Sequence, residues 1–159
     1  MTDEIMLSEE EELSENSIKD MYLSFYTDGG EYALDVANVK EVQGLSIITA
    51  VPNQPDFVKG IINLRGDIVP VIEVRKRFLK PEKNYDDKTC IIIINYDDEI
   101  LGLIVDEIKG VYTITEENIA SPPSVRLSHE NIFVKNIGMT EDGVKLLLDI
   151  DKLLLLMSE

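Results

Sequence analysis

Two segments of the chain occur twice in the same order, and this internal repeat restricts the fold more than any other feature. Residues 21–42, MYLSFYTDGGEYALDVANVKEV, align without a gap with residues 90–111, CIIIINYDDEILGLIVDEIKGV. Residues 57–78 align in the same way with residues 133–154, and both copies begin with Phe-Val-Lys. The alternative explanation is chance similarity between strands of biased composition. Two repeated pairs in one order instead indicate an internal duplication, so we expect two similar halves.

Each copy contains short apolar stretches separated by turn residues and shows little helical pattern. In the first aligned pair, a strand runs into a tight turn, at residues 28–30 or 97–99, then into a second strand and one short helical turn. Many short strands with regularly spaced turns are typical of a small barrel. Two halves of about 65 residues would each be marginally stable alone, so they should share an apolar core. The run from Ile91 to Ile94, apolar on both faces, is predicted to lie at that junction.

These patterns predict a mostly β fold of two side-by-side five-stranded barrels that arose by internal duplication. The first barrel is predicted to span roughly residues 21–86 and the second roughly residues 87–148. A short C-terminal helix is expected at residues 149–157, because its acidic start suits the positive end of a helix dipole. Residues 1–20 hold eight acidic residues and one lysine, which predicts a disordered tail.

The charge balance limits the classes of partner. The chain has 31 acidic and 15 basic residues, a formal net charge of -16 and a pI near 4.3. Such a chain repels polyanions, so neither nucleic acid nor an anionic membrane surface is an expected partner. The single cysteine, Cys90, cannot form an internal disulfide and reads as a small core residue in a protein of a reducing compartment. With no signal peptide or long apolar segment in the sequence, we expect a cytoplasmic protein without membrane insertion.

Residues that would carry catalysis or hold a metal are not organised into a recognisable motif. The only histidine, His129, lies in a polar stretch, and no nucleophile motif accompanies it. The acidic run 97–99 lacks the alternate spacing of a calcium loop and reads as a turn. We therefore predict no catalytic residue, no metal and no cofactor. A pair of carboxylates acting as acid and base stays open in so acidic a chain.

The stretch 60–78, GIINLRGDIVPVIEVRKRF, predicts two strands joined at Arg65-Gly66-Asp67. Gly66 suits the turn because glycine adopts positive φ without steric cost. In the second copy the matching positions carry Met139-Thr140-Glu141-Asp142, so the fold does not require an arginine at the turn. Arg65 is therefore a candidate contact residue.

The same stretch resembles the signature of the CheW family, adaptors that couple bacterial chemoreceptors to the CheA histidine kinase. The resemblance spans most of residues 20–157 and rests on an ordered set of motifs: Val51-Pro52, Phe57-Val58-Lys59-Gly60, Asn63-Leu64-Arg65-Gly66, Ile68-Val69-Pro70-Val71 and Leu101-Gly102-Leu103-Ile104-Val105-Asp106. It implies two SH3-like barrels, no reaction of its own, and a cytoplasmic protein recruited to receptor arrays. The implied partners are the regulatory domain of a CheA-type kinase and the cytoplasmic tip of a chemoreceptor.

The resemblance also implies which residues bind partners. The arginine of the family motif falls on Arg65, and Asn63 and Gly66 belong to the same motif. A glutamate of the family falls on Glu41, and we expect it to pair with Arg65 within the molecule. Because exposed ion pairs stabilise little, such a pair would shape a binding surface.

The receptor-contacting apolar positions of the family fall on Val39 and on its repeat counterpart Ile108. The two are expected to flank one groove between the barrels that takes a receptor helix. An apolar residue at each position is equally what barrel packing requires. Gly60 and Gly102 match glycines at tight strand crossings and are expected to be structural. The chain departs from the family at Glu73, where aspartate is typical and caps a helix better.

Three interpretations stay open. The cluster Arg75-Lys76-Arg77, next to Lys80 and Lys83, either meets acidic groups of a partner or balances local charge. The chain could serve another CheA-like pathway, such as surface motility, with the same fold. From a different class, a small hydrolase using a carboxylate pair is the rival hypothesis.

Overall fold

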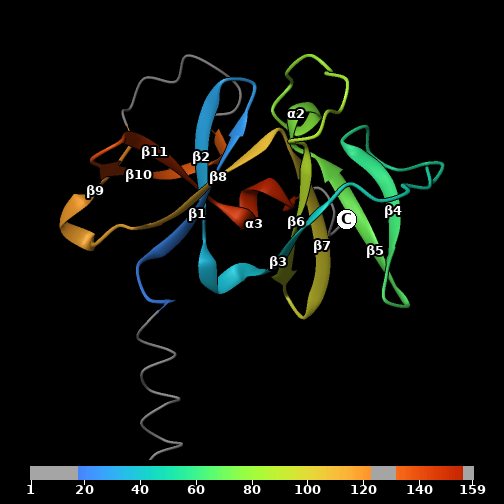
Figure 1. Ribbon diagram of the computed structural model, residues 1–159, viewed down its shortest axis with the longest axis horizontal. Coiled ribbons are helices and arrows are strands. Elements are labelled where there is room, and N and C mark those ends of the chain that lie inside the picture. The colour runs from blue at the N-terminus through green and yellow to red at the C-terminus, as the bar shows by residue number, and fades with distance from the viewer. Residues whose placement is uncertain (1–17, 123–131, 156–159) are drawn as a thin grey trace, which may run out of the picture.

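The computed structural model describes residues 18–122 and 132–155, and these form two β-sheets that lie side by side (Figure 1). The six-stranded sheet has the order β8 (Glu107–Thr113), β1 (Met21–Thr27), β2 (Gly30–Asp35), β11 (Gly143–Leu148), β10 (Val134–Thr140), β9 (Ile119–Ala120). The five-stranded sheet has the order β3 (Val39–Gly44), β6 (Cys90–Tyr96), β7 (Glu99–Val105), β5 (Asp67–Glu73), β4 (Val58–Leu64). The helical elements are the short helices α2 (Val74–Arg77) and α3 (Ile150–Leu153) and the 3₁₀ turns η1 (Val36–Asn38) and η2 (Glu116–Asn118).

The predicted mostly β fold of two small barrels with short helices is confirmed, and so is the repeat. Strands β1, β2 and β3 of the first copy correspond to β6, β7 and β8 of the second, and β4-β5-α2 corresponds to β10-β11-α3. One sheet has the predicted five strands, and the other has a sixth, β9, of two residues. The first copy holds only an isolated bridge, Thr49 to Ile61, at the matching place.

The predicted division into consecutive barrels at residues 21–86 and 87–148 is wrong, because the two copies exchange strands. The β1-β2 hairpin of the first copy pairs with β8 and β11 of the second, and the β6-β7 hairpin pairs with β3 and β5 of the first. The six-stranded sheet is thus built from the two ends of the described chain, and the five-stranded sheet from its middle. Corresponding strands carry the same apolar pattern, so consecutive and exchanged pairing bury equivalent faces.

The largest apolar cluster lies between the sheets and includes α3, which Figure 1 shows at the centre of the molecule. Alternate residues of β6 face different cores, since successive side chains of a strand point to opposite faces. Ile92 and Ile94 belong to the shared cluster, whereas Ile91 and Ile93 fill the interior of the five-stranded barrel. The prediction that this isoleucine run lies at the junction is confirmed for Ile92 and Ile94, and Ile91 and Ile93 face the barrel interior instead.

The interior of the six-stranded barrel contains a buried ion pair. Lys145 is only 1% exposed, and its Nζ lies 2.5 Å from Glu31 Oε2 and 4.6 Å from the ring centre of Tyr112. Ser24 Oγ donates a hydrogen bond to the same carboxylate oxygen at 2.7 Å. Burial alone would raise the pKa of Glu31, but the hydrogen bonds from Lys145 and Ser24 outweigh it and lower that pKa.

Gly60 and Gly102 lie where the backbone approaches neighbouring atoms closely. A Cβ on Gly60 would be 2.2 Å from the carbonyl oxygen of Thr49, and a Cβ on Gly102 would be 2.7 Å from a methyl group of Val71. Both distances are shorter than any side chain tolerates without displacing its neighbour. The predicted structural role of both glycines is confirmed.

The two short helices begin differently. Asp149 caps α3, because its Oδ1 accepts a hydrogen bond from the backbone N–H of Lys152 at 3.2 Å. Glu73 makes no such cap at α2, and its buried carboxylate accepts a hydrogen bond from the hydroxyl of Tyr85 instead. The longer side chain therefore anchors the 79–89 loop, and α2 forms without a side-chain cap.

Two sequence predictions extend beyond the described residues. The C-terminal helix expected at residues 149–157 is found as α3, which covers only four residues, and residues 156–157 lie outside the described ranges. Most of the predicted acidic tail and His129 also lie outside them. Within residues 18–122 and 132–155, no helix is long and apolar enough to cross a bilayer.

Candidate functional site

Arg65 lies in the two-residue turn between β4 and β5, the hairpin at the right of Figure 1. Arg65 has φ +50° and Gly66 has φ +94°, the positive pair typical of a type I′ hairpin turn. The side-chain oxygen of Asn63 accepts a hydrogen bond from the Gly66 N–H at 2.8 Å and so fixes the turn. Asparagine, aspartate and glycine adopt the positive φ found at position 65 more readily than arginine does. The turn geometry therefore does not explain the arginine.

Arg65 and Glu41 form the predicted ion pair. Arg65 Nη2 lies 2.9 Å from Glu41 Oε2, and the side chains are 67% and 30% exposed. Glu41 lies on β3 and Arg65 follows β4, so the pair links the two edge strands of the five-stranded sheet. The hydrogen bond from Arg65 to Glu41 raises the pKa of the guanidinium. A guanidinium has five N–H donors, so Arg65 keeps donors for a partner.

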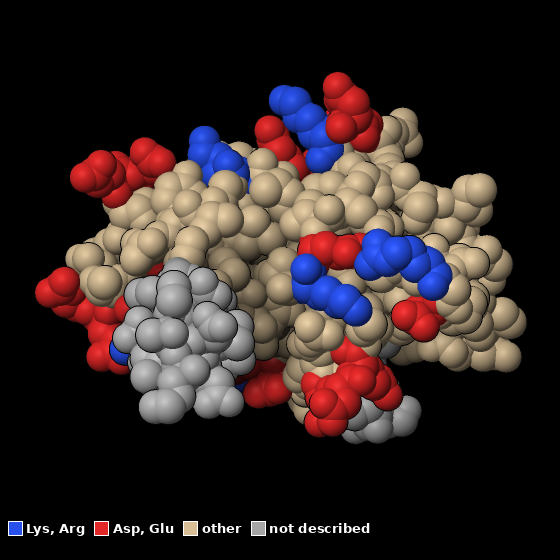
Figure 2. Space-filling model, turned by 60° about the horizontal axis from the view of Figure 1, so that its bottom comes forward, with Lys and Arg blue, Asp and Glu red and all other residues tan. Residues whose placement is uncertain are grey.

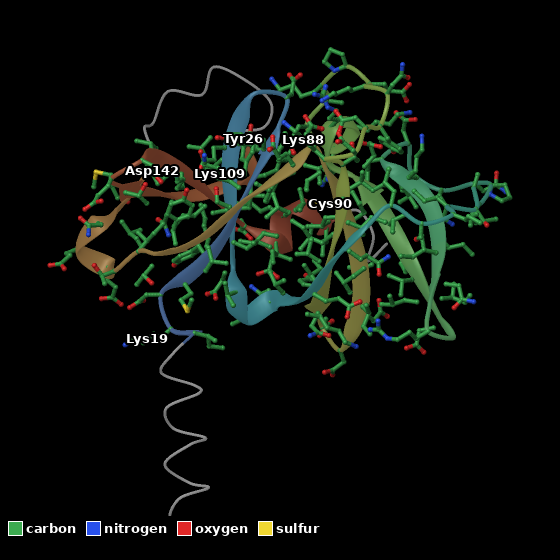
Figure 3. All side chains as sticks on the ribbon, in the orientation of Figure 1. Lys19, Tyr26, Lys88, Cys90, Lys109 and Asp142 are labelled. Atoms are coloured by element: carbon green, nitrogen blue, oxygen red, sulfur yellow. The ribbon has the colours of Figure 1, made fainter. Side chains whose placement is uncertain are left out.

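A groove of about 390 Å³ lies where β3 of one sheet faces the start of β8 of the other. Its lining residues are Val42, Gln43, Gly44, Lys88, Cys90, Glu107 and Ile108. Figure 3 shows Lys88 and Cys90 near the junction of the two sheets. The groove thus has an apolar strip with residues from both sheets. At its rim, Lys88 Nζ lies 3.8 Å from Glu107 Oε1.

The structure separates the two apolar positions that the resemblance implied. Ile108 lines the groove, but Val39 does not, and Val42 takes that place on β3. Both Val39 and Ile108 are half-buried and pack against the shared core. Val42 is 42% exposed, and its repeat counterpart Val111 is 52% exposed. Sequence reasoning missed Val42 because it considered only Val39, whereas the regular alternation of β3 places Val42 on the opposite, more exposed face.

The thiol of Cys90 lies on the groove floor and is not set up for chemistry. Burial raises the pKa of this thiol, which disfavours the reactive thiolate. Its 9% exposure agrees with the predicted core role.

The basic cluster of the sequence does not form one surface. Arg75 is 9% exposed and Arg77 packs between two aromatic rings, so both point inward. Lys76 alone reaches outward, where its Nζ lies 2.7 Å from Glu82 and 3.4 Å from Asp56. The interpretation of the three residues as one patch for an acidic partner is therefore wrong for the two arginines.

The remaining surface of residues 18–122 and 132–155 carries scattered charges. On the face shown in Figure 2, acidic side chains gather in several groups, and most of the basic ones lie beside acidic ones. Among the residues that the structure describes, no group of three or more histidine, cysteine, aspartate and glutamate side chains is placed to hold a metal ion.

Comparisons with known proteins match nearly the whole chain. A family model described as CheW-like domain matches residues 21–156. The chain is 32% identical over 142 residues to "Chemotaxis protein CheW" of Klebsiella aerogenes, covering 89% of this chain and 86% of that protein. It is 37% identical over 130 residues to the protein of the same name from Bacillus subtilis, covering 82% and 83%. The solved structure of the scaffolding protein TtCheW from Thermoanaerobacter tengcongensis matches with a TM-score of 0.76 and 35% identity, covering 82% of this chain and 88% of that one.

Proposed function

The chain belongs to the CheW-like domain family, and we propose that it is a chemotaxis scaffold that couples chemoreceptors to a CheA-type histidine kinase without catalysing a reaction. Its relatives carry chemotaxis and scaffolding names, which support this role and not the rival hydrolase hypothesis. In this role the protein works in the cytoplasm and joins membrane arrays through its receptors.

The observation that carries the proposal is the exposed Arg65–Glu41 pair at 2.9 Å. Arg65 occupies a left-handed turn position that the fold alone would fill with a smaller residue. Its planar fork of donors suits carboxylates and backbone carbonyls of a protein partner. We assign Arg65, Glu41, Asn63 and Gly66 to one partner-binding surface, in which Asn63 and Gly66 hold the turn.

The groove between β3 and β8 is the proposed receptor site. It presents Val42 and Ile108 to an amphipathic helix, which would lay its apolar face along the strip. The rim charges Lys88 and Glu107 would give the helix a direction. Val39 contributes by packing beneath this wall on the shared core.

The kinase contact is proposed at an open strand edge, where the regulatory domain docks a barrel of the same kind. A contact of standard size would bury about 800 Å² on each partner. The groove walls β3 and β8 are edge strands themselves, so a scaffold that holds both partners at once would offer the kinase one of the other edges, β4 or β9.

Calorimetric titration against a kinase regulatory domain and against a soluble receptor-tip fragment tests the proposal. Wild-type protein should bind both, and Arg65→Glu should lose at least about tenfold in affinity for one of them, because a charge reversal costs several hydrogen bonds and adds repulsion. The matched control is Glu141→Lys, which changes the charge at the corresponding turn of the other repeat. Binding of neither partner by folded wild-type protein would refute the proposal.

A second pair of variants locates the receptor site. Val42→Asp places a charge on the groove strip and should abolish receptor-tip binding, since a helix would have to bury it. Val111→Asp introduces the same charge at the repeat counterpart, which is exposed but does not line the groove. Equal losses from both variants would contradict the assignment of the groove.

A further inference from the structure

Arg75, on the short helix α2, is held by carboxylates from two other segments. Its Nε and Nη2 donate to Asp106 at 2.9 and 2.7 Å, and its Nη1 donates to Asp28 Oδ1 at 3.1 Å and to the carbonyl of Pro81 at 2.8 Å. The backbone N–H of Asp28 also donates to Asp106 Oδ2 at 2.8 Å. The arginine and both aspartates therefore form one connected network, here called the Arg75 clamp.

The Arg75 clamp joins the two sheets. Arg75 follows β5 of the five-stranded sheet, whereas Asp28 lies in the β1-β2 turn of the six-stranded sheet. Asp106 is the single residue between β7 and β8, where the chain crosses from one sheet to the other. Its N–H donates to the carbonyl of Tyr26 on β1 at 3.0 Å. A change in the angle between the sheets at this place would break the network.

At the other junction between the sheets, no arginine of the described residues takes the corresponding place. By the repeat, Arg75 corresponds to Asp151 on α3, and Asp28 corresponds to Asp97 in the β6-β7 turn. That side holds a small pocket of about 160 Å³, whose lining includes Asp151, Tyr96 and Lys135. The internal duplication is thus locked by an arginine on one side only.

The clamped side is the side of the groove. Asp106 directly precedes Glu107 and Ile108, which form the β8 wall, and the opposite wall, Val42 to Gly44, belongs to the five-stranded sheet. We propose that Arg75 is a positioning residue that holds the start of β8 against the five-stranded sheet and thereby sets the width of the groove. The inference rests on the proposed function, because it concerns the receptor site of that proposal.

Spin labels measure the groove width directly. Lys40 on β3 and Lys109 on β8 are repeat counterparts with exposed side chains, so Lys40→Cys and Lys109→Cys place one label on each wall strand. The native Cys90 stays in place, because its thiol is buried and its raised pKa disfavours labelling, and wild-type protein treated with the same label reports any reaction there. Arg75→Met should broaden the distance distribution between them, whereas Lys76→Met, the neighbouring change on α2, should leave it unchanged.

Receptor-tip titration measures the consequence. Folded Arg75→Met should bind the tip about tenfold more weakly, and its unchanged affinity for the kinase domain reports an intact fold. If Arg75→Met does not fold, Arg75→Lys and Asp28→Asn replace it; each removes part of the network and should give an intermediate broadening. An unaltered distance distribution and tip affinity in the folded variants would overturn the proposal.

Failure of the proposed function has a different signature. In that case wild-type protein itself binds no receptor tip, while the distance distributions still decide whether Arg75 fixes the two walls.

Discussion

Phe57 and Phe133 occupy corresponding positions in the two repeats, and the guanidinium carbon of Arg77 lies 4.6 Å from the ring centre of each. Arg77 Nε also donates to the carbonyl of Leu153 at 2.7 Å and Nη2 to that of Lys152 at 3.1 Å. Both carbonyls lie at the C-terminal end of α3. A cation stabilises a helix there because that end carries partial negative charge. Arg77 therefore ties both halves of the duplication to the helix between the sheets.

Arg77→Ala should lower the free energy of unfolding by about 2–4 kcal/mol, because it removes two cation–π contacts and two hydrogen bonds to a helix end. Arg77→Lys keeps the charge but not the planar fork and should lose roughly half as much. Urea unfolding followed by circular dichroism measures both. The control is Lys76→Ala, which removes two ion pairs to exposed carboxylates and should cost no more than about 1 kcal/mol. A loss as small for Arg77→Ala would refute the assigned role.

The buried Lys145–Glu31 pair has an apolar counterpart in the other barrel, where Val69 and Ile100 occupy the corresponding positions. Lys145→Val alone should lower the free energy of unfolding by about 2–4 kcal/mol, since it leaves the half-buried Glu31 without its cation. The double variant Lys145→Val with Glu31→Ile should recover most of that loss, because it copies the apolar pair.

Chemical denaturation of the two single variants and the double variant completes a thermodynamic cycle for this pair. Losses that simply add in the double variant would mean that Lys145 and Glu31 do not interact strongly, against the 2.5 Å contact.

The repeat was predictable because matching apolar and turn residues recur in the same order. The strands, the short helices and the shared core were predicted from it. The exchange of strands was not predictable from the pattern. The parallel pairings of Leu146 with Tyr32 and of Leu103 with Ile72 each join a strand of one copy to a strand of the other, and the alternative partners within each copy carry the same alternation. The choice between the two strand pairings depends on hydrogen bonds between residues distant in the sequence. The periodicity of apolar residues does not reveal such partners.

The candidate site was also predicted only in part, because some of its contacts join residues that are distant in the sequence. Arg65 and Glu41 were identified from a motif and from a turn that does not need an arginine, and they do pair. Arg75 and Arg77 read as a surface cluster, because Asp28 and Asp106, the carboxylates that turn Arg75 inward, are 47 and 31 residues away in the sequence. The groove depends on how the two sheets pack, which the sequence pattern leaves undetermined.

Glu73, whose carboxylate is buried, provides a pH-dependent test of its hydrogen bond with Tyr85. Burial raises the pKa of Glu73, although the hydrogen bond from Tyr85 and the charge of Lys59 partly offset this. A raised folded pKa means that wild-type protein loses stability as the pH rises from about 4.5 through that pKa. Glu73→Gln stays neutral and can still accept from Tyr85, so its advantage over wild type should grow between pH 4.5 and pH 8.

Urea unfolding of wild type and Glu73→Gln across this range measures the effect. Glu82→Gln provides a control that should be independent of pH over this range, because a hydrogen bond from Lys76 lowers the pKa of Glu82 and its contribution changes only below about pH 4.5. A pH-independent difference between wild type and Glu73→Gln would show that the carboxylate is not desolvated in solution.

Asp106 should show the reverse dependence on pH. Burial alone would raise its pKa, but the hydrogen bonds from Arg75 and from the Asp28 N–H, together with the charge of Arg75, outweigh burial and lower it. A lowered folded pKa gives stability that is fully present above the unfolded value near 3.8 and is lost as the pH falls through the folded pKa.

Asp106→Asn should therefore cost about 2–4 kcal/mol at pH 7, because Arg75 stays buried without its main carboxylate. The difference from wild type should shrink as the pH falls below 3.8. Urea unfolding at a series of pH values measures it, with Asp98→Asn in the exposed β6-β7 turn as the control. A difference that is the same at pH 7 and in acid would mean that the clamp acts through shape rather than through charge, and the Arg75–Asp106 contact would then have to be assigned to packing.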